Sequence, residues 1–257
     1  MIRLSSITIY PIKSLGPVSL EEAVVEPRGL RDDRRMMMVD PEGKFITQRQ
    51  HAGLALFRVK PHAEGWELSH PDHGSCLVPR EPSGGRLDVV VWKSDVSARL
   101  VDPTVDSWLS KATGLSVRLV AMDDESHRPC GEGEVSFADG YPVLLIGEAS
   151  LAELNRRVGE GLSMRRFRTN LTTTGGNPHD EDAARWVRLP DAEFENVKPC
   201  GRCIVTTLDP DTGEGGVEPL QTLATYRKEG QSVNFGVNLV PTRLGTVRVG
   251  DLVNFER

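Results

Sequence analysis

The sequence predicts a β-rich α+β protein built on a barrel. Three observations lead to this fold class. Short runs of β-branched and apolar residues recur along the whole chain, separated by Pro, Gly and Asp turns. Helical spacing of apolar residues occurs only in a few short segments. The length of 257 residues, with 38% hydrophobic and 26% charged residues, suits one large domain or two closely packed domains.

Short strands dominate the first half of the chain, spaced as in an antiparallel sheet or barrel. We expect strands at residues 3–10, 18–25, 36–39, 45–48, 54–60, 87–92, 96–101 and 116–121. Residues 61–85 are polar and rich in Gly and Pro, so we interpret them as an excursion from the sheet with one strand-like piece at 66–68. A helix should begin after Asp102, which can cap it, and end before Gly114.

The second half of the chain combines strands with two further helices. Residues 141–146 form a continuous apolar run, which predicts a buried strand. Ser150 and Glu153 resemble a capping box that opens a helix reaching Arg157. A short helix is expected at 219–228. The remaining strands are expected at 167–174, 186–189, 202–208, 246–249 and 252–255, with the last two forming a closing hairpin.

Composition and charge exclude several classes of function. The net charge of −6 argues against a broad phosphate-backbone footprint, so we expect no nucleic-acid partner. The first residues lack a secretory signal pattern, and no run of about 18 apolar residues could span a membrane. We therefore expect a cytoplasmic protein with no membrane partner.

The densest cluster of chemistry is the pair Cys200 and Cys203, with Arg202 between them. The other cysteines, Cys76 and Cys130, stand alone, which excludes a disulfide framework and an iron–sulfur cluster. A thiol beside an arginine at a strand mouth suits ligation of a soft metal or nucleophilic chemistry. A lone Cys-x-x-Cys completes no zinc site, and an inert buried role for one of the two stays open.

Basic residues gather at predicted strand ends and turns. The clusters are Lys13 with Ser14, then Arg31 with Arg34 and Arg35, and Arg166 with Arg168 and Asn170, the last three on one strand face. Each cluster taken singly is interpreted as a solvated face or structural ion pairs. Together, in an acidic chain, they suit a phosphate-bearing ligand. We interpret His70, His73 and Cys76, evenly spaced in the polar excursion, as solvated residues.

These residues resemble the MOSC proteins, named for the C-terminal domain of molybdenum cofactor sulfurase. The motifs occur in order as Tyr10-Pro-Ile-Lys-Ser14, Gly29-Leu-Arg-Asp-Asp-Arg34, Thr47-Gln-Arg-Gln50, Phe167-Arg-Thr-Asn170, Lys198-Pro-Cys-Gly-Arg-Cys203, Phe235-Gly236 and Val249-Gly-Asp251. Within the superfamily the chain is most similar to the mitochondrial amidoxime-reducing component and its bacterial N-hydroxylaminopurine-resistance relatives. The resemblance implies an N-terminal MOSC β-barrel domain over residues 1–120 and a MOSC β-barrel over 121–257.

The resemblance also implies the site. Cys203 aligns with the molybdenum ligand, and Asp139 aligns with an acid near the substrate that could deliver a proton. Gly201 stands where the animal proteins have a serine. The implied cofactor contacts are Lys13, Ser14, Arg34, Arg168, Asn170, Gly201 and Arg202.

The implied function is a molybdenum-cofactor oxidoreductase that carries Mo-molybdopterin and reduces N-hydroxylated substrates such as hydroxylamines and amidoximes. The sequence has no Gly-x-Gly-x-x-Gly turn and no clustered cysteines, so a separate flavoprotein, ferredoxin or cytochrome has to supply electrons. The alternative is a molybdenum cofactor or sulfur carrier without its own turnover, in which Cys203 carries a persulfide or shelters the cofactor. Pyridoxal phosphate is associated with the superfamily, and Lys13 is the lysine to exclude as its Schiff-base partner. A structural zinc module is a third alternative.

Overall fold

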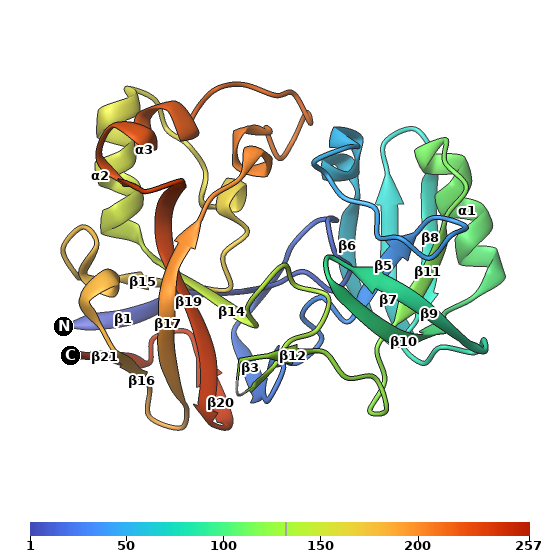
Figure 1. The fold of residues 1–257 in the computed structure, drawn as a ribbon, viewed down its shortest axis with the longest axis horizontal. Helices are drawn as coiled ribbons and strands as arrows, with labels where there is room; N and C mark the ends of the chain where they lie inside the picture. The colour runs from blue at the N-terminus through green and yellow to red at the C-terminus, as the bar shows by residue number, and fades with distance from the viewer. Residues whose placement is uncertain (132) are drawn as a thin grey trace.

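The computed structural model describes residues 1–131 and 133–257, which form two lobes (Figure 1). The barrel lobe carries both ends of the chain together with helices α2 (Glu148–Val158) and α3 (Leu220–Tyr226). The second lobe, formed by residues 36–121, carries helix α1 (Pro103–Thr113). Among the described residues, none of the helices is long and apolar enough to cross a membrane.

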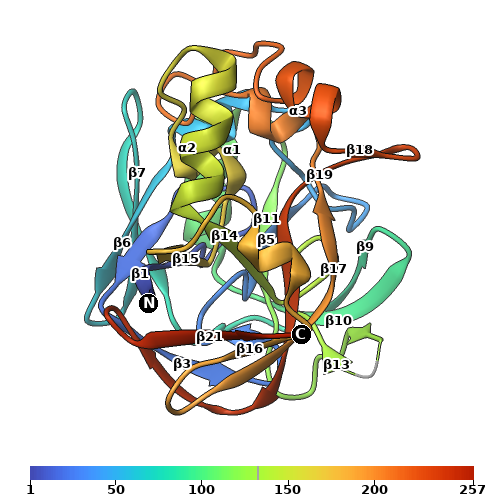
Figure 2. The same cartoon turned by 90° about the vertical axis from the view of Figure 1, so that its left-hand side faces the viewer.

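The barrel lobe is a closed ring of strands. Around the ring lie β14 (Val143–Gly147), β15 (Leu171–Thr174), β1 (Ile2–Ile9), β21 (Leu252–Glu256), β16 (Trp186–Arg188), β17 (Glu193–Gly201) and β19 (Ser232–Arg243). Pairing of β19 with β14, with Leu145 opposite Val237, closes the ring. Figure 2 faces this lobe and shows β1 between β15 and β21. The first strand of the chain therefore has a paired neighbour on each side within the ring.

Strand β14 is buried on both faces, which explains its continuous apolar sequence. Val143 and Leu145 face the main core together with Val237. Leu144 and Ile146 face a second cluster beneath α2 and α3. The predicted buried strand at 141–146 is confirmed.

The second lobe contains two sheets. One has the order β5 (Met36–Val39), β11 (Arg118–Ala121), β10 (Ser94–Leu100), β9 (Arg86–Val91), and the other is β6 (Arg58–His62), β7 (Gly65–His70), β8 (Gly74–Pro79). Helix α1 begins as predicted, because the Asp102 carboxylate accepts hydrogen bonds from the amides of Thr104 and Val105. It ends at Gly114, which adopts the left-handed conformation.

Short elements complete the fold. The remaining strands are β2 (Val18–Leu20), β3 (Glu22–Glu26), β4 (Gly29–Leu30), β12 (Pro129–Cys130), β13 (Gly133–Glu134), β18 (Lys228–Glu229) and β20 (Gly245–Arg248). The 3-10 turns are η1 (Ala52–Leu56), η2 (Met164–Phe167), η3 (Asp180–Ala183) and η4 (Ile204–Thr207). The predicted β-rich α+β class with a barrel is confirmed.

The interpretation of residues 61–85 as a polar excursion is wrong. This segment supplies β7 and β8, which complete a sheet with β6. Trp66, Leu68 and Val78 point into the main core and are at most 5% exposed. His70 is half-buried and its ring lies 4.9 Å from that of Phe57, so it is not a solvated residue.

The predicted capping box is also wrong. Helix α2 begins at Glu148, two residues before Ser150. The Ser150 hydroxyl is fully buried and donates to the Glu181 carboxylate at 2.7 Å, so it fixes a neighbouring turn instead of capping its own helix.

Several predicted strands have different boundaries. Segment 18–25 divides into β2 and β3, which belong to different sheets, and 45–48 is a loop after an isolated bridge at Phe45. Segment 54–60 divides into η1 and β6. Strands β20 and β21 form no closing hairpin within the described residues, since β20 pairs with β3 while β21 pairs with β1 and β16. Strand β19 was not predicted, because asparagines and Gly236 interrupt its apolar pattern.

Substituting Gly236 by Ala should destabilise the barrel at its closure. Gly236 has φ of 75°, and a Cβ there would lie 2.5 Å from Ile146 Cγ1 and 2.7 Å from the Leu145 carbonyl oxygen. We expect a loss of about 3 kcal/mol in unfolding free energy from backbone strain and overpacking together, measured by urea denaturation. Gly74→Ala is the matched control, because Gly74 has φ of 67° with open space around it. Equal losses in the two variants would contradict the steric explanation.

Candidate active site

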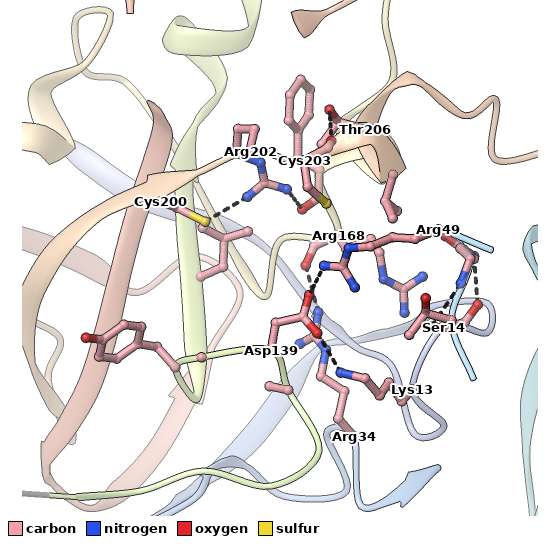
Figure 3. Close-up of a pocket in the computed structure, with 18 of the residues that line it drawn as sticks. Lys13, Ser14, Arg34, Arg49, Asp139, Arg168, Cys200, Arg202, Cys203 and Thr206 are labelled. Atoms are coloured by element: carbon pink, nitrogen blue, oxygen red, sulfur yellow. Dashed lines mark hydrogen bonds and ion pairs between the residues drawn. The ribbon is translucent and has the colours of Figure 1, made fainter. Parts of the chain in front are cut away.

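All but one of the residues predicted to bind the cofactor meet at one cavity between the two lobes, the exception being Gly201 (Figure 3). This inner cavity has a volume of about 140 Å³. Its lining includes Lys13, Ser14, Arg34, Asp139, Arg168, Asn170, Arg202 and Cys203. A wider outer groove of about 600 Å³ adjoins it, contains Gly201, and shares Arg49, Asp139 and Cys203 with the inner cavity. The expectation that these distant residues share one pocket is therefore confirmed, while their roles stay predictions.

The ring of Tyr10 contacts two half-buried arginines that line the inner cavity. The guanidinium carbons of Arg34 and Arg168 lie 4.5 and 4.1 Å from the centroid of its ring. The buried Asp33 carboxylate accepts from the Tyr10 amide at 2.8 Å and from Arg34 at 2.6 Å. Arg34 also donates to the Asn170 side chain and to the Arg168 carbonyl, both at 3.0 Å. These contacts hold both guanidinium groups in fixed positions.

Two guanidinium groups in this wall have buried nitrogens with no partner among the described residues. Arg168 donates from Nη1 to the Leu15 carbonyl at 2.9 Å, but its Nη2 is buried and unpaired. Burial lowers the pKa of Arg168 to about 10. Arg202 donates to the Cys200 thiol at 2.9 Å and to the Phe167 carbonyl at 2.6 Å, and its Nε is buried and unpaired. Unpaired buried donors are costly, so this wall suits an anionic ligand.

Arg168 reaches the cavity through a turn, so the predicted strand at 167–174 is wrong at its start. Residues 164–167 form η2, Arg168 is left-handed with φ of 54°, and β15 begins only at Leu171. Arg166 donates a hydrogen bond to the Asp209 carboxylate at 3.0 Å and does not share a strand face with Arg168.

The two neighbouring thiols have different surroundings. Strand β17 ends at Gly201, and Cys203 precedes η4, so the predicted strand at 202–208 is wrong. The turn forms because the Thr206 amide and hydroxyl both donate to the Cys203 carbonyl, at 3.1 and 2.9 Å. The Cys200 thiol accepts from Arg202, whereas the Cys203 thiol lies beside Arg49 (Figure 3). Both thiols line the inner cavity and the outer groove, and Cys203 is the one that is not hydrogen-bonded to Arg202.

Asp139 binds two cations from the N-terminal part of the chain. Its carboxylate accepts from Lys13 at 2.6 Å, from Arg49 at 2.5 Å and from the Trp92 indole at 3.3 Å. Although burial opposes ionisation, Lys13 and Arg49 hold the pKa of Asp139 well below its usual range. Asp139 is thus a carboxylate at neutral pH, which argues against the proton-donor role predicted for it. It positions the two cations instead.

Lys13 and Ser14 lie in the loop after β1. Burial lowers the pKa of Lys13 to about 8, and its ammonium also donates to the Phe137 carbonyl at 2.6 Å. Ser14 is left-handed with φ of 69°, and its carbonyl accepts from the Gln48 side chain at 2.7 Å. The sequence reasoning assigned no role to Arg49. Arg49 lies in the Thr47-Gln-Arg-Gln50 motif, but a strand was predicted at 45–48 where the structure has the loop that carries Arg49.

Comparisons with known proteins identify the family. A model of the MOSC domain matches residues 132–254, and a model of the MOSC N-terminal beta barrel domain matches residues 1–115. Mitochondrial amidoxime reducing component 2 from Rattus norvegicus is 32% identical, covering 97% of this chain and 82% of the relative. The chain belongs to the MOSC family.

A second relative is similar over the same share of the chain. Mitochondrial amidoxime-reducing component 1 from Homo sapiens is 30% identical, covering 97% of this chain and 82% of the relative. A crystal structure of the YUAD protein from Bacillus subtilis shares 9% identity, with a TM-score of 0.45, over 98% of this chain and 94% of that one. The predicted division at residue 120 stays a prediction.

Replacing Lys13 by Met should change how stability depends on pH. The pKa of Lys13 is about 8 in the folded protein against 10.5 ordinarily, so between these values the unfolded chain binds more protons. Wild-type stability should therefore rise relative to Lys13→Met above about pH 8, by up to about 1.4 kcal/mol per pH unit. Chemical denaturation of both proteins across this range measures the difference. A constant difference would refute the depressed pKa.

Proposed function

We propose that this MOSC protein binds the molybdenum cofactor and reduces N-hydroxylated substrates with electrons from a separate protein. One observation carries the proposal: the Cys203 thiol opens onto a cavity whose wall contains buried, unpaired nitrogens of Arg168 and Arg202. A thiolate suits a soft metal, and fixed guanidinium groups suit a phosphate. The printed names of the relatives, amidoxime-reducing components, support the choice of substrate class.

The residues present fit the cofactor. Cys203 would hold the metal, and Arg168 with Arg34 would hold the phosphate. Asn170 and Ser14 line the same cavity and would contact the pterin. When bound, the cofactor supplies a metal centre that exchanges two electrons with the substrate. Lys13 is an unsuitable Schiff-base lysine for pyridoxal phosphate, because it is 5% exposed and donates to both Phe137 and Asp139.

The reaction consumes two electrons and two protons. A substrate R–NH–OH would become R–NH₂ and water as its N–O bond breaks. The electrons would come from a flavoprotein, ferredoxin or cytochrome, since the sequence contains no dinucleotide turn and no cysteine cluster. With Asp139 ionised, Lys13 is the group in the cavity whose pKa, about 8, suits proton transfer near neutral pH.

The first test identifies the metal ligand. Cys203→Ala should lower the molybdenum content by more than about tenfold, since even outer partners of a metal ligand contribute that much. Cys200→Ala should retain most of the metal, because the Cys200 thiol accepts a hydrogen bond from Arg202 and is not the predicted ligand. Elemental analysis of protein from molybdate-replete cells gives the readout. The reverse pattern would overturn the assignment of Cys203. Sulfane sulfur without molybdenum would favour the carrier alternative, and zinc would favour a structural module.

The second test concerns the electron donor. Protein loaded with molybdenum cofactor should fail to reduce benzamidoxime to benzamidine with reduced nicotinamide alone. A reduced viologen should restore turnover because it needs only access to the metal, and a flavoprotein, ferredoxin or cytochrome system should do the same. Turnover of highly purified protein with nicotinamide alone would refute the external-donor proposal. Absence of turnover with viologen, in protein shown to contain molybdenum, would favour the carrier alternative.

A further inference from the structure

We propose that Arg49 binds the oxygen of the substrate's N-hydroxy group, an inference that rests on the proposed function. Arg49 belongs to a loop of the second lobe, yet it lines both the inner cavity and the outer groove. Its side chain lies beside the Cys203 thiol, and Figure 3 shows it between that thiol and Asp139. A substrate that enters from the groove meets Arg49 next to the predicted metal ligand.

The guanidinium of Arg49 is held in place before any substrate arrives. One of its nitrogens donates to Asp139 at 2.5 Å, and its guanidinium carbon lies 4.9 Å from the centroid of the Trp92 ring. The Trp92 indole donates to the same carboxylate at 3.3 Å and its ring lies 5.0 Å from that of Phe45. Trp92 remains 47% exposed at a hairpin tip with φ of 59°, a strained position for a large side chain. These contacts leave the Arg49 side chain 24% exposed. Its Nη2 is engaged with Asp139, and its remaining donors can serve the neighbouring Cys203 sulfur and a ligand.

Other cations near Cys203 are engaged differently. Within the described chain, Arg49 and Arg202 are the cations that line both the inner cavity and the outer groove. Arg202 directs both terminal nitrogens to Cys200 and Phe167. Lys198 lines the outer groove but not the inner cavity, and its ammonium lies 5.0 Å from the centroid of the Tyr141 ring. Arg49 is therefore the cation best placed to contact the reacting group.

The chemistry of a guanidinium suits this task. It carries five donors and no acceptor, so it binds an oxygen lone pair and does not compete for protons. Negative charge develops on the hydroxyl oxygen as the N–O bond breaks, and a fixed cation stabilises that charge without reorganisation. The amine product lacks this oxygen and loses the contact. The site should therefore prefer an N-hydroxy compound to its reduced product.

The experiment compares binding of phenylhydroxylamine and aniline, which are both neutral near pH 7 and differ by one oxygen. Calorimetry is done anaerobically on cofactor-loaded protein without an electron donor, so no turnover occurs. Wild type should prefer phenylhydroxylamine, and Arg49→Gln should lose about tenfold or more of that preference, as expected for a charged hydrogen bond. The KM for benzamidoxime should rise in parallel, with rates normalised to the molybdenum content of each variant.

Arg80→Gln is the matched control. Arg80 also pairs with a carboxylate, Asp32, at 2.8 Å and lies 5.3 Å from a tryptophan ring, that of Trp66, but it lines neither the inner cavity nor the outer groove. It should keep the wild-type preference. Should Arg49→Gln lose its cofactor, Arg49→Lys retains the charge without the fork, and the preference should still fall.

The outcomes separate the two proposals. If wild type turns over benzamidoxime with viologen while both Arg49 variants retain the wild-type preference and KM, the role of Arg49 is overturned and the proposed function stands. If molybdenum-loaded wild type turns over no N-hydroxylated substrate, the proposed function fails and the role of Arg49 fails with it. Loss of preference in the Arg49 variants, but not in Arg80→Gln, supports both.

Discussion

The contact of both Arg34 and Arg168 with the ring of Tyr10 is the interaction on which the site depends. It joins the segments that follow β1 and β4 to the turn that precedes β15, so it fixes two of the cations that line the inner cavity. Burying two like charges this close is unfavourable unless partners compensate them. Asp33 compensates one, and Asp139 binds Lys13 and Arg49 nearby. In this group four cations face two carboxylates, an excess of two positive charges, which complements a phosphate carrying nearly two negative charges at neutral pH.

Local sequence predicted those parts of the fold that local forces determine. Helix α1 followed from the Asp102 cap and Gly114, and β14 followed from an apolar run that is buried on both faces. The same approach failed where packing between distant segments decides the outcome. Trp66 and Leu68 lie in a sheet that looks polar in sequence, because its outer positions and turns are polar. Strand β20 pairs with β3 and strand β21 pairs with β1, and each of these pairs spans more than two hundred residues of sequence.

The site shows the same division. Residue types and their order were sufficient to predict that Lys13, Arg168 and Cys203 line one cavity. The ionisation of Asp139 was not predictable, because its partners Lys13 and Arg49 lie 126 and 90 positions away in sequence. The path of the chain at Arg168 was missed for a different reason. A non-glycine residue in the left-handed conformation gives no sequence signal, since the surrounding contacts impose it.

The position of β1 within the ring has a consequence for synthesis of the protein on the ribosome. Residues 2–9 emerge long before residues 252–253, yet Ile2 pairs with Val253 and Arg3 with Leu252. One edge of β1 must therefore stay unpaired until β21 has been translated. Contacts of such high sequence separation form slowly, and an exposed apolar strand edge invites association with other nascent chains. The protein should depend on chaperones that shield this edge, and it should be released from them only when β21 completes the ring.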